Sequence, residues 1–86
     1  MEYLRLEDIL QIHSFIIDET DGSHGVRDSG SIQSAAQAPK QSFGGEDAYP
    51  DVFKKAAVYL LRIIMNHPFV DGNKRTAVTV ATIFSE

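Results

Sequence analysis

One stretch of this 86-residue chain, residues 67–75, collects the functional groups that phosphate chemistry requires. An imidazole, a carboxylate, a glycine, an amide and two cations occur there as His67, Asp71, Gly72, Asn73, Lys74 and Arg75. Taken singly, each has an ordinary explanation, since carboxylates and amides often cap helices and paired charges often lie on solvated surfaces. Gathered within nine positions, they favour a phosphate-binding site.

The residues after Gly72 are expected to begin a helix, which is where phosphate binds well. Glycine has no side chain, so backbone N–H groups near Gly72 can approach an anion closely. A first helical turn formed by residues 73–75 would offer free N–H groups and the positive end of the helix dipole. Lys74 and Arg75 oppose that dipole, and a bound anion would remove the conflict.

His67 and Asp71 could supply the rest of the chemistry. Histidine is the side chain that titrates near neutral pH, so His67 is suited to accept a proton from an attacking hydroxyl. Asp71 could bind a divalent cation, because Mg²⁺ usually takes one or two carboxylates together with substrate phosphates. The alternatives are an exposed loop histidine and a helix cap formed by Asp71 or Asn73.

Two apolar helices are expected on either side of this stretch. The first, from about residue 51 to Asn66, is predicted to be the central helix of a bundle, because its apolar residues cover much of its circumference. Its predicted face consists of Val52, Phe53, Ala56, Ala57, Leu60, Leu61 and Ile64. Pro68 disfavours helical angles at His67 and should end it. The second helix should bury Ala77, Val80, Ala81 and Phe84.

The first forty residues predict two further helices. Helical spacing of apolar residues indicates one from about residue 5 to residue 18, with His13 on its apolar face. A packed core or boundary histidine is the simpler interpretation of His13. Asp28 or Ser29 could cap a shorter helix that buries Ile32, Ala35 and Ala36 and ends before Pro39.

Residues 40–49 lack a helical pattern. The Phe43-Gly44-Gly45 sequence predicts a hairpin-like or irregular segment, because paired glycines weaken regular structure. An exposed extended edge there could receive a peptide strand. A plain connector is the interpretation that the residues alone favour.

Bulk properties narrow the functional class. The length fits one domain, residues 1–86, and the net charge of −4 argues against a general nucleic-acid binder. The chain has no cysteines, no apolar run of membrane-spanning length and no signal-peptide pattern. We therefore expect no membrane partner and no direct nucleic-acid partner, with a cytoplasmic location by default.

Residues 67–75 resemble the motif of the Fic/Doc family, which runs His-x-Phe-x-Asp/Glu-Gly-Asn-Gly-Arg-x-x-Arg. The sequence matches it at His67, Phe69, Asp71, Gly72, Asn73 and Arg75. It departs from it at Lys74, where the family has glycine, and at Val78, where it has a second arginine. Lysine followed by Arg-Thr-Ala resembles the Doc (death-on-curing) branch, and the similarity extends over nearly all of the chain.

The resemblance implies an all-α fold, a small helical bundle with a short β-hairpin flap at residues 40–46. The flap would dock the protein target through Ser42, Phe43, Gly44 and Gly45. Fic enzymes use ATP and Mg²⁺ to transfer AMP to a protein hydroxyl. Doc, the toxin of a toxin–antitoxin pair, instead transfers the γ-phosphate to translation elongation factor Tu.

By the same resemblance, His67 would be the general base and Asp71 the magnesium ligand. Gly72 and Asn73 would shape the anion-binding turn, while Lys74 and Arg75 would hold phosphates. A lysine at position 74 fills space that glycine leaves for a diphosphate, and Val78 lacks the second phosphate clamp. Both differences favour phosphoryl transfer over AMP transfer.

Three hypotheses follow: a Doc-like kinase toxin, a Fic-type AMP-transferase, and an inactive truncated domain that only binds a partner. The third rests on the chain's end at Glu86 within an apolar helix without a stop signal, so we expect a domain incomplete at its C-terminus. That helix could also pair two copies. The inhibitory Fic motif is matched only partly by residues 42–47, which favours control by a separate antitoxin covering the ATP site.

Overall fold

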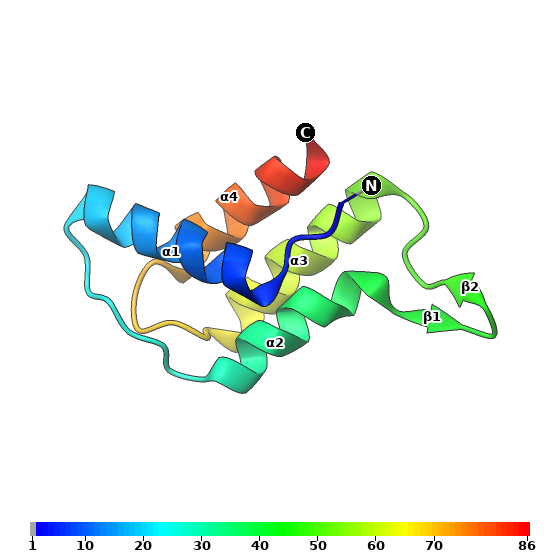
Figure 1. The fold of residues 1–86 in the computed structure, drawn as a ribbon, viewed down its shortest axis with the longest axis horizontal. Helices are drawn as coiled ribbons and strands as arrows, with labels where there is room; N and C mark the ends of the chain where they lie inside the picture. The colour runs from blue at the N-terminus through cyan, green and yellow to red at the C-terminus, as the bar shows by residue number, and fades with distance from the viewer. Residues whose placement is uncertain (1) are drawn as a thin grey trace.

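The computed structural model describes residues 2–86 and shows an all-α fold with one small hairpin (Figure 1). The four α-helices are α1 (Leu6–Thr20), α2 (Ser29–Gln37), α3 (Val52–Asn66) and α4 (Asn73–Ser85). A 3₁₀ turn, η1 (Ala38–Lys40), and the strands β1 (Ser42–Phe43) and β2 (Glu46–Asp47) connect α2 to α3. The predicted fold class, a helical bundle with a short β-hairpin, is confirmed.

Local sequence signals set the helix boundaries. Asp28 caps α2 by accepting a hydrogen bond from the Ser31 N–H, and Asp51 caps α3 by accepting one of 2.7 Å from the Lys54 N–H. Hydrogen bonds from Ser31 lower the pKa of Asp28, and the bond from the Ser31 hydroxyl has a larger effect than the bond from its backbone N–H. Asp28 therefore contributes helix stability above its ordinary pKa, and that contribution is lost as the pH falls through the lowered value.

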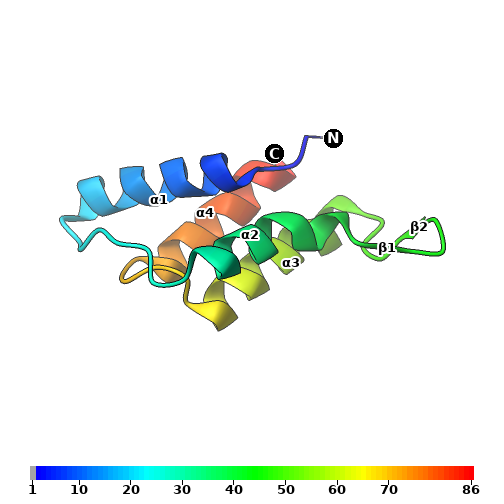
Figure 2. The same cartoon turned by 60° about the horizontal axis from the view of Figure 1, so that its bottom comes forward.

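The helices surround one apolar core. Helix α3 packs against α4 and α2, whereas α1 lies across α2 and α4 (Figures 1 and 2). The faces predicted for α2 and α4 are buried as expected, apart from a half-buried Ala81. The core residues are Ile9, Ile32, Ala35, Ala36, Ala56, Tyr59, Ile63, Phe69, Ala77, Val80 and Phe84. Within residues 2–86, every helix is too short or too polar to span a lipid bilayer.

The wide apolar face predicted for α3 is wrong in part. Phe53 is 82% exposed and Leu61 is 51% exposed, and Ala57 also faces outward. Lys55 and Tyr59 are buried instead. The reason is that α2 and α4 cover only one side of α3. Lys55 and Tyr59 lie on the covered side, and the polar end of each side chain is hydrogen bonded. The Tyr59 hydroxyl accepts from the Leu4 N–H at 3.0 Å and donates to the Leu4 carbonyl at 3.2 Å.

Lys55 connects the hairpin to the helical body. Its ammonium donates to the Pro39 carbonyl at 3.2 Å and lies 3.5 Å from a carboxylate oxygen of Asp47 on β2. The nearby Tyr3 side chain, and then the Asp47 carboxylate, raise the pKa of Lys55 against the effect of burial. The lysine therefore stays charged at neutral pH and holds β2 at the start of α3.

The two strands of the hairpin are joined by a tight two-residue turn. Ser42 pairs with Asp47 and Phe43 with Glu46, and the turn residues Gly44 and Gly45 have φ angles of +59° and +85°. Positive φ at both central positions is the geometry that glycine allows. All residues of the hairpin are exposed.

The orientation of α3 can be tested with two substitutions two residues apart. We expect Ile63→Ala to lower the free energy of unfolding by about 2–5 kcal/mol, because it removes a fully buried side chain. Leu61→Ala should change it by less than about 0.5 kcal/mol, since that side chain is largely exposed. Urea unfolding followed by circular dichroism measures both, and equal effects would contradict the observed burial.

Candidate functional site

The loop that joins α3 to α4, residues 67–72, is held by a second loop, residues 21–28. The Val70 N–H donates to the Gly25 carbonyl at 3.0 Å, and the Pro68 carbonyl accepts from the Arg27 N–H at 2.7 Å. An antiparallel bridge between Val26 and Phe69 lies between these bonds. The predicted catalytic stretch is therefore fixed by backbone pairing to the segment that follows α1.

His67 occupies an unusual backbone conformation. It ends α3 as predicted, with φ +46° and ψ +59°, and its N–H donates to the Ile63 carbonyl. A left-handed conformation at a residue other than glycine costs about 1–3 kcal/mol, and such strain is often found at functional sites. The exposed imidazole lines a pocket that also contains Asp71 and Lys74.

The Asp71 carboxylate is oriented by two backbone groups. One oxygen accepts from the Ser23 N–H at 3.1 Å and the other from the Gly72 N–H at 2.9 Å. A carboxylate offers about four lone-pair positions, so two remain for further ligands. A side chain at Gly22 would displace this carboxylate, because its Cβ would lie 2.8 Å from an Asp71 carboxylate oxygen.

Gly72 is the N-terminal cap residue of α4, and it has no side chain that could bond to the free N–H groups of the first turn. Its φ angle of +77° lies in the left-handed region that favours glycine, and a Cβ at this position would lie 2.8 Å from Ile17 Cδ1, so the end of the Ile17 side chain would have to shift. No side chain caps the helix, so neither Asp71 nor Asn73 is the predicted cap. Within residues 2–86, the N–H groups of residues 73–75 have no hydrogen-bond acceptor, and the first helical bond runs from Thr76 to Gly72.

The Asn73 side chain shapes the loop from inside. Its carbonyl oxygen accepts from the Phe69 N–H and its amide nitrogen donates to the Phe69 carbonyl, both at 2.9 Å. This pair of bonds closes the turn between Phe69 and Asn73. The amide is therefore engaged by the protein, and the backbone N–H of Asn73 is the group left for a ligand.

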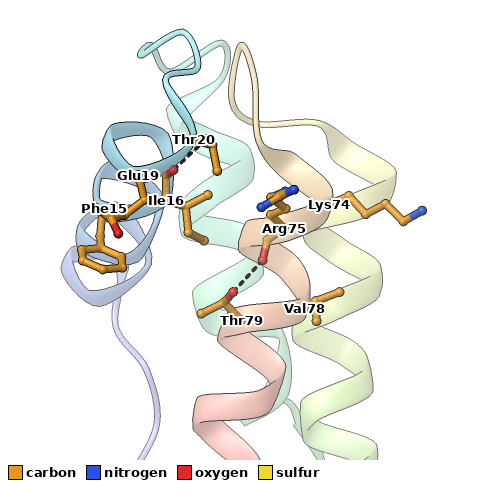
Figure 3. A pocket seen from close by; sticks show the side chains of 8 residues that line it. All are labelled: Phe15, Ile16, Glu19, Thr20, Lys74, Arg75, Val78 and Thr79. Atoms are coloured by element: carbon orange, nitrogen blue, oxygen red, sulfur yellow. Dashed lines mark hydrogen bonds between the residues drawn. The ribbon is translucent and has the colours of Figure 1, made fainter.

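The two cations of the motif have no acidic partner within residues 2–86. Lys74 and Arg75 are exposed, and neither forms an ion pair with any residue in the described part of the chain. Arg75 turns toward α1, whereas Lys74 extends away from it (Figure 3). Their charges add to the positive end of the α4 dipole, so this end of the helix is built for an anion.

Two neighbouring pockets share this cationic turn. The first, of about 500 Å³, is lined by every residue predicted to serve as base, metal ligand or phosphate ligand. Those residues are His67, Asp71, Gly72, Asn73, Lys74 and Arg75. The second, of about 450 Å³, lies between α1 and α4 and has a largely apolar lining that includes Phe15, Ile16 and Val78 (Figure 3). Thr20, Lys74 and Arg75 line both pockets.

The predicted docking flap does not join this site. Ser42, Phe43, Gly44 and Gly45 line neither pocket. The hairpin precedes α3 and His67 follows it, and the two lie at opposite ends of that 15-residue helix (Figures 1 and 2). At 1.5 Å per residue, such a helix separates its ends by about 22 Å.

Three residues of the 1–28 region support the site without having been predicted to do so. His13, buried as expected, contacts the Asp71 carbonyl through its Nε2 atom at 2.8 Å. Ser23 orients the Asp71 carboxylate, and Gly22 leaves room for it. The turn-rich Asp21-Gly22-Ser23 sequence signals a loop, but nothing in it identifies a partner 48 residues away.

A magnesium ion would fit this pocket only together with a phosphate ligand. Within residues 2–86, no group of three or more His, Asp or Glu side chains is arranged to hold a metal. The single oriented carboxylate of Asp71 matches the way Mg²⁺ binds in nucleotide sites, where phosphates and water supply most ligands.

The two hydrogen bonds between Asn73 and Phe69 predict that substitution of Asn73 destabilises the protein more than substitution of the neighbouring Lys74. Asn73→Ala should lower the free energy of unfolding by about 1–3 kcal/mol, because it leaves the partly buried N–H and carbonyl of Phe69 without partners. Lys74→Ala, which removes an exposed and unpaired charge, should change it by less than about 0.5 kcal/mol. Urea denaturation of both variants measures the difference, and an Asn73→Ala variant as stable as the parent would exclude the clamp.

Sequence comparison places the chain among known proteins. The profile of the Fic/DOC family matches residues 3–85. The chain is 42% identical over 83 residues to "Toxin Doc" of Mycolicibacterium smegmatis, an alignment covering 96% of the chain and 62% of that protein. It is 29% identical over 84 residues to "Protein kinase doc" of Escherichia phage P1, covering 98% of the chain and 66% of the relative.

The chain thus spans less than two thirds of the length of both curated relatives. No solved structure matches it significantly. The family match nevertheless covers nearly the whole chain, including every residue of the pocket described above. This chain belongs to the Fic/DOC family.

Proposed function

We propose that the chain acts as the catalytic part of a Doc-like toxin that transfers a phosphoryl group from ATP to a protein hydroxyl. The observation that carries this proposal is the pocket at the start of α4. It combines an exposed imidazole, an oriented carboxylate, three free N–H groups and two unpaired cations. The toxin and kinase parts of the proposal are supported by the names of the two relatives.

Each group of the pocket receives one task. His67 accepts the proton of the target hydroxyl as that oxygen attacks the γ-phosphorus of ATP, and the bond from this phosphorus to the β–γ bridging oxygen breaks to release ADP. The N–H groups of residues 73–75 bind phosphate oxygens, and Lys74 and Arg75 neutralise their charge. Asp71 has two lone-pair positions left to ligate Mg²⁺. When bound, Mg²⁺ would supply positive charge that offsets the negative charge developing during transfer.

Phosphoryl transfer is favoured over AMP transfer by two side chains. Lys74 fills space beside the turn and provides a point charge, where the Fic pattern has glycine. Val78, one helical turn further on, is 49% exposed and contributes an apolar surface where the Fic pattern has a second arginine. With a single guanidinium, from Arg75, the site has fewer means to hold a diphosphate in the orientation that AMP transfer needs.

The proposed target is a protein such as elongation factor Tu, which the family resemblance suggests. The exposed hairpin, with Phe43 74% exposed, offers a strand edge for a target segment. Because the hairpin and His67 lie beyond opposite ends of α3, a segment bound at both places must span at least about 22 Å. That span requires at least roughly seven extended residues at about 3.3 Å each.

A separate antitoxin is the proposed regulator. The pocket between α1 and α4 adjoins the phosphate site, and its lining includes Arg75 and the exposed side chains of Phe15 and Val78 (Figure 3). An apolar helix carrying a carboxylate would complement this surface.

Phe15→Asp should abolish growth rescue by a co-expressed antitoxin, because it places a charge on this apolar surface. Phosphoryl transfer should stay within about twofold of the parent, since Phe15 lies outside the catalytic pocket. Rescue at the parental level would refute this contact surface.

Phosphoryl transfer and AMP transfer can be distinguished by which labelled phosphate of ATP is transferred to protein. The protein is incubated with Mg²⁺, a bacterial lysate and ATP labelled at either the α- or the γ-phosphate. We expect transfer from the γ-position alone, and a loss of about 10²-fold or more in His67→Ala. The matched control is His24→Ala, an exposed histidine outside the pocket, which should transfer at the parental rate. Chelation of Mg²⁺ should abolish transfer.

The other outcomes each select an alternative. Transfer of the α-label would refute the kinase and support an AMP-transferase. Absence of any His67-dependent transfer would support a domain that only binds an antitoxin or a second copy of itself. Analytical ultracentrifugation would then decide between these partners, because self-association depends on the concentration of this chain alone.

A further inference from the structure

We propose that His13 is a positioning residue for the Asp71–Gly72 segment, acting through the main-chain carbonyl of Asp71. Its effect on ligand binding rests on the proposed function. Its effect on the loop does not, and can be measured without any ligand.

The hydrogen bond of His13 joins the first helix to the middle of the catalytic loop. His13 lies in α1 and is 4% exposed, and its Nε2 atom lies 2.8 Å from the Asp71 carbonyl oxygen. A carbonyl oxygen can only accept, so Nε2 must carry the proton that is shared. This contact therefore specifies one tautomer of the ring in its neutral form.

A second contact fixes the plane of the same ring. The imidazole is stacked on the ring of Phe69, with centroids 3.7 Å apart and planes 6° from parallel. Phe69 is 1% exposed, and both its backbone N–H and its carbonyl are held by Asn73. The stack sets the plane of the imidazole, and the bond to Asp71 sets its direction within that plane.

The bond determines which way the Asp71–Gly72 peptide faces. Its carbonyl points inward to α1, while the Asp71 side chain stays exposed in the pocket and accepts from Ser23. The Gly72 N–H of the same peptide donates to the Asp71 carboxylate. Because α4 begins at the next residue, rotation of this peptide would move both the carboxylate and the free N–H groups.

A purely space-filling role for His13 makes a different prediction. Burying an imidazole among apolar side chains costs free energy unless it is hydrogen bonded, so an apolar ring would serve packing at least as well. If His13 only fills space, His13→Phe should leave the loop unchanged. If it positions the peptide, that variant should loosen the loop although the stack on Phe69 can be retained.

The test compares two variants that each keep one of the two contacts. His13→Phe keeps an aromatic ring and loses the donor, whereas His13→Gln keeps an N–H donor and loses the ring. Amide hydrogen exchange at Gly72 is measured by NMR in the ligand-free protein, with His24→Gln, an exposed histidine whose ring contacts Asp18 and not residues 67–72, as the control. We expect exchange about tenfold faster in His13→Phe, and within about threefold of the parent in His13→Gln.

The dissociation constant for Mg²⁺·ATP provides the second readout. We expect this constant to rise in the same order, by about tenfold in His13→Phe and by less in His13→Gln. Parental Gly72 exchange in His13→Phe, or equal acceleration in both variants, would overturn the proposal. If the parent binds no Mg²⁺·ATP, the proposed function fails, while the exchange measurement still decides the role of His13.

A measurement on the unaltered chain keeps the proposal testable if His13→Phe does not fold. The ¹⁵N shifts of the His13 ring report which nitrogen carries the proton. Protonation at Nε2 in the neutral ring is the expected result. A neutral ring protonated at Nδ1 would overturn the proposal, because such a ring cannot donate to the Asp71 carbonyl.

Discussion

The hydrogen-bonded closure of the loop between α3 and α4 is the constraint on which the candidate site depends. Asn73 holds both backbone groups of Phe69, and Phe69 in turn lies buried in the core against the His13 ring. Because one end of this clamp is the first residue of α4, the loop and the helix start move as one unit. The groups that could bind phosphate are thereby placed without using any of them for structure.

The electrostatics of the site follow from what the helix start lacks. Gly72 provides no capping side chain, and Lys74 and Arg75 place two positive charges where a helix normally prefers acids. This arrangement costs stability in the free chain and is relieved by an anion. It also explains how a chain of net charge −4 can carry a local site for phosphate.

The hairpin belongs to a different region of the molecule. Lys55 holds Asp47 near the start of α3, while the catalytic loop follows the end of the same helix. A target protein that used both features would have to contact the molecule along the length of α3. The exposed side of that helix, with Phe53 and Leu61, lies between the two and remains uncovered in this structure.

The sequence by itself determined features that depend on neighbouring residues: Asp28 as one of two candidate caps for α2, the start of α3 near Asp51, the end of α3 before Pro68, and the motif of residues 67–75. Only the tertiary structure decided the rest. The outward side of α3, the burial of Lys55 and the separation of hairpin and His67 by the whole length of α3, about 22 Å, follow from how helices pack. The bond from His13 to Asp71 joins residues 58 positions apart, and helical periodicity reports that a histidine is buried but not which backbone group it will meet.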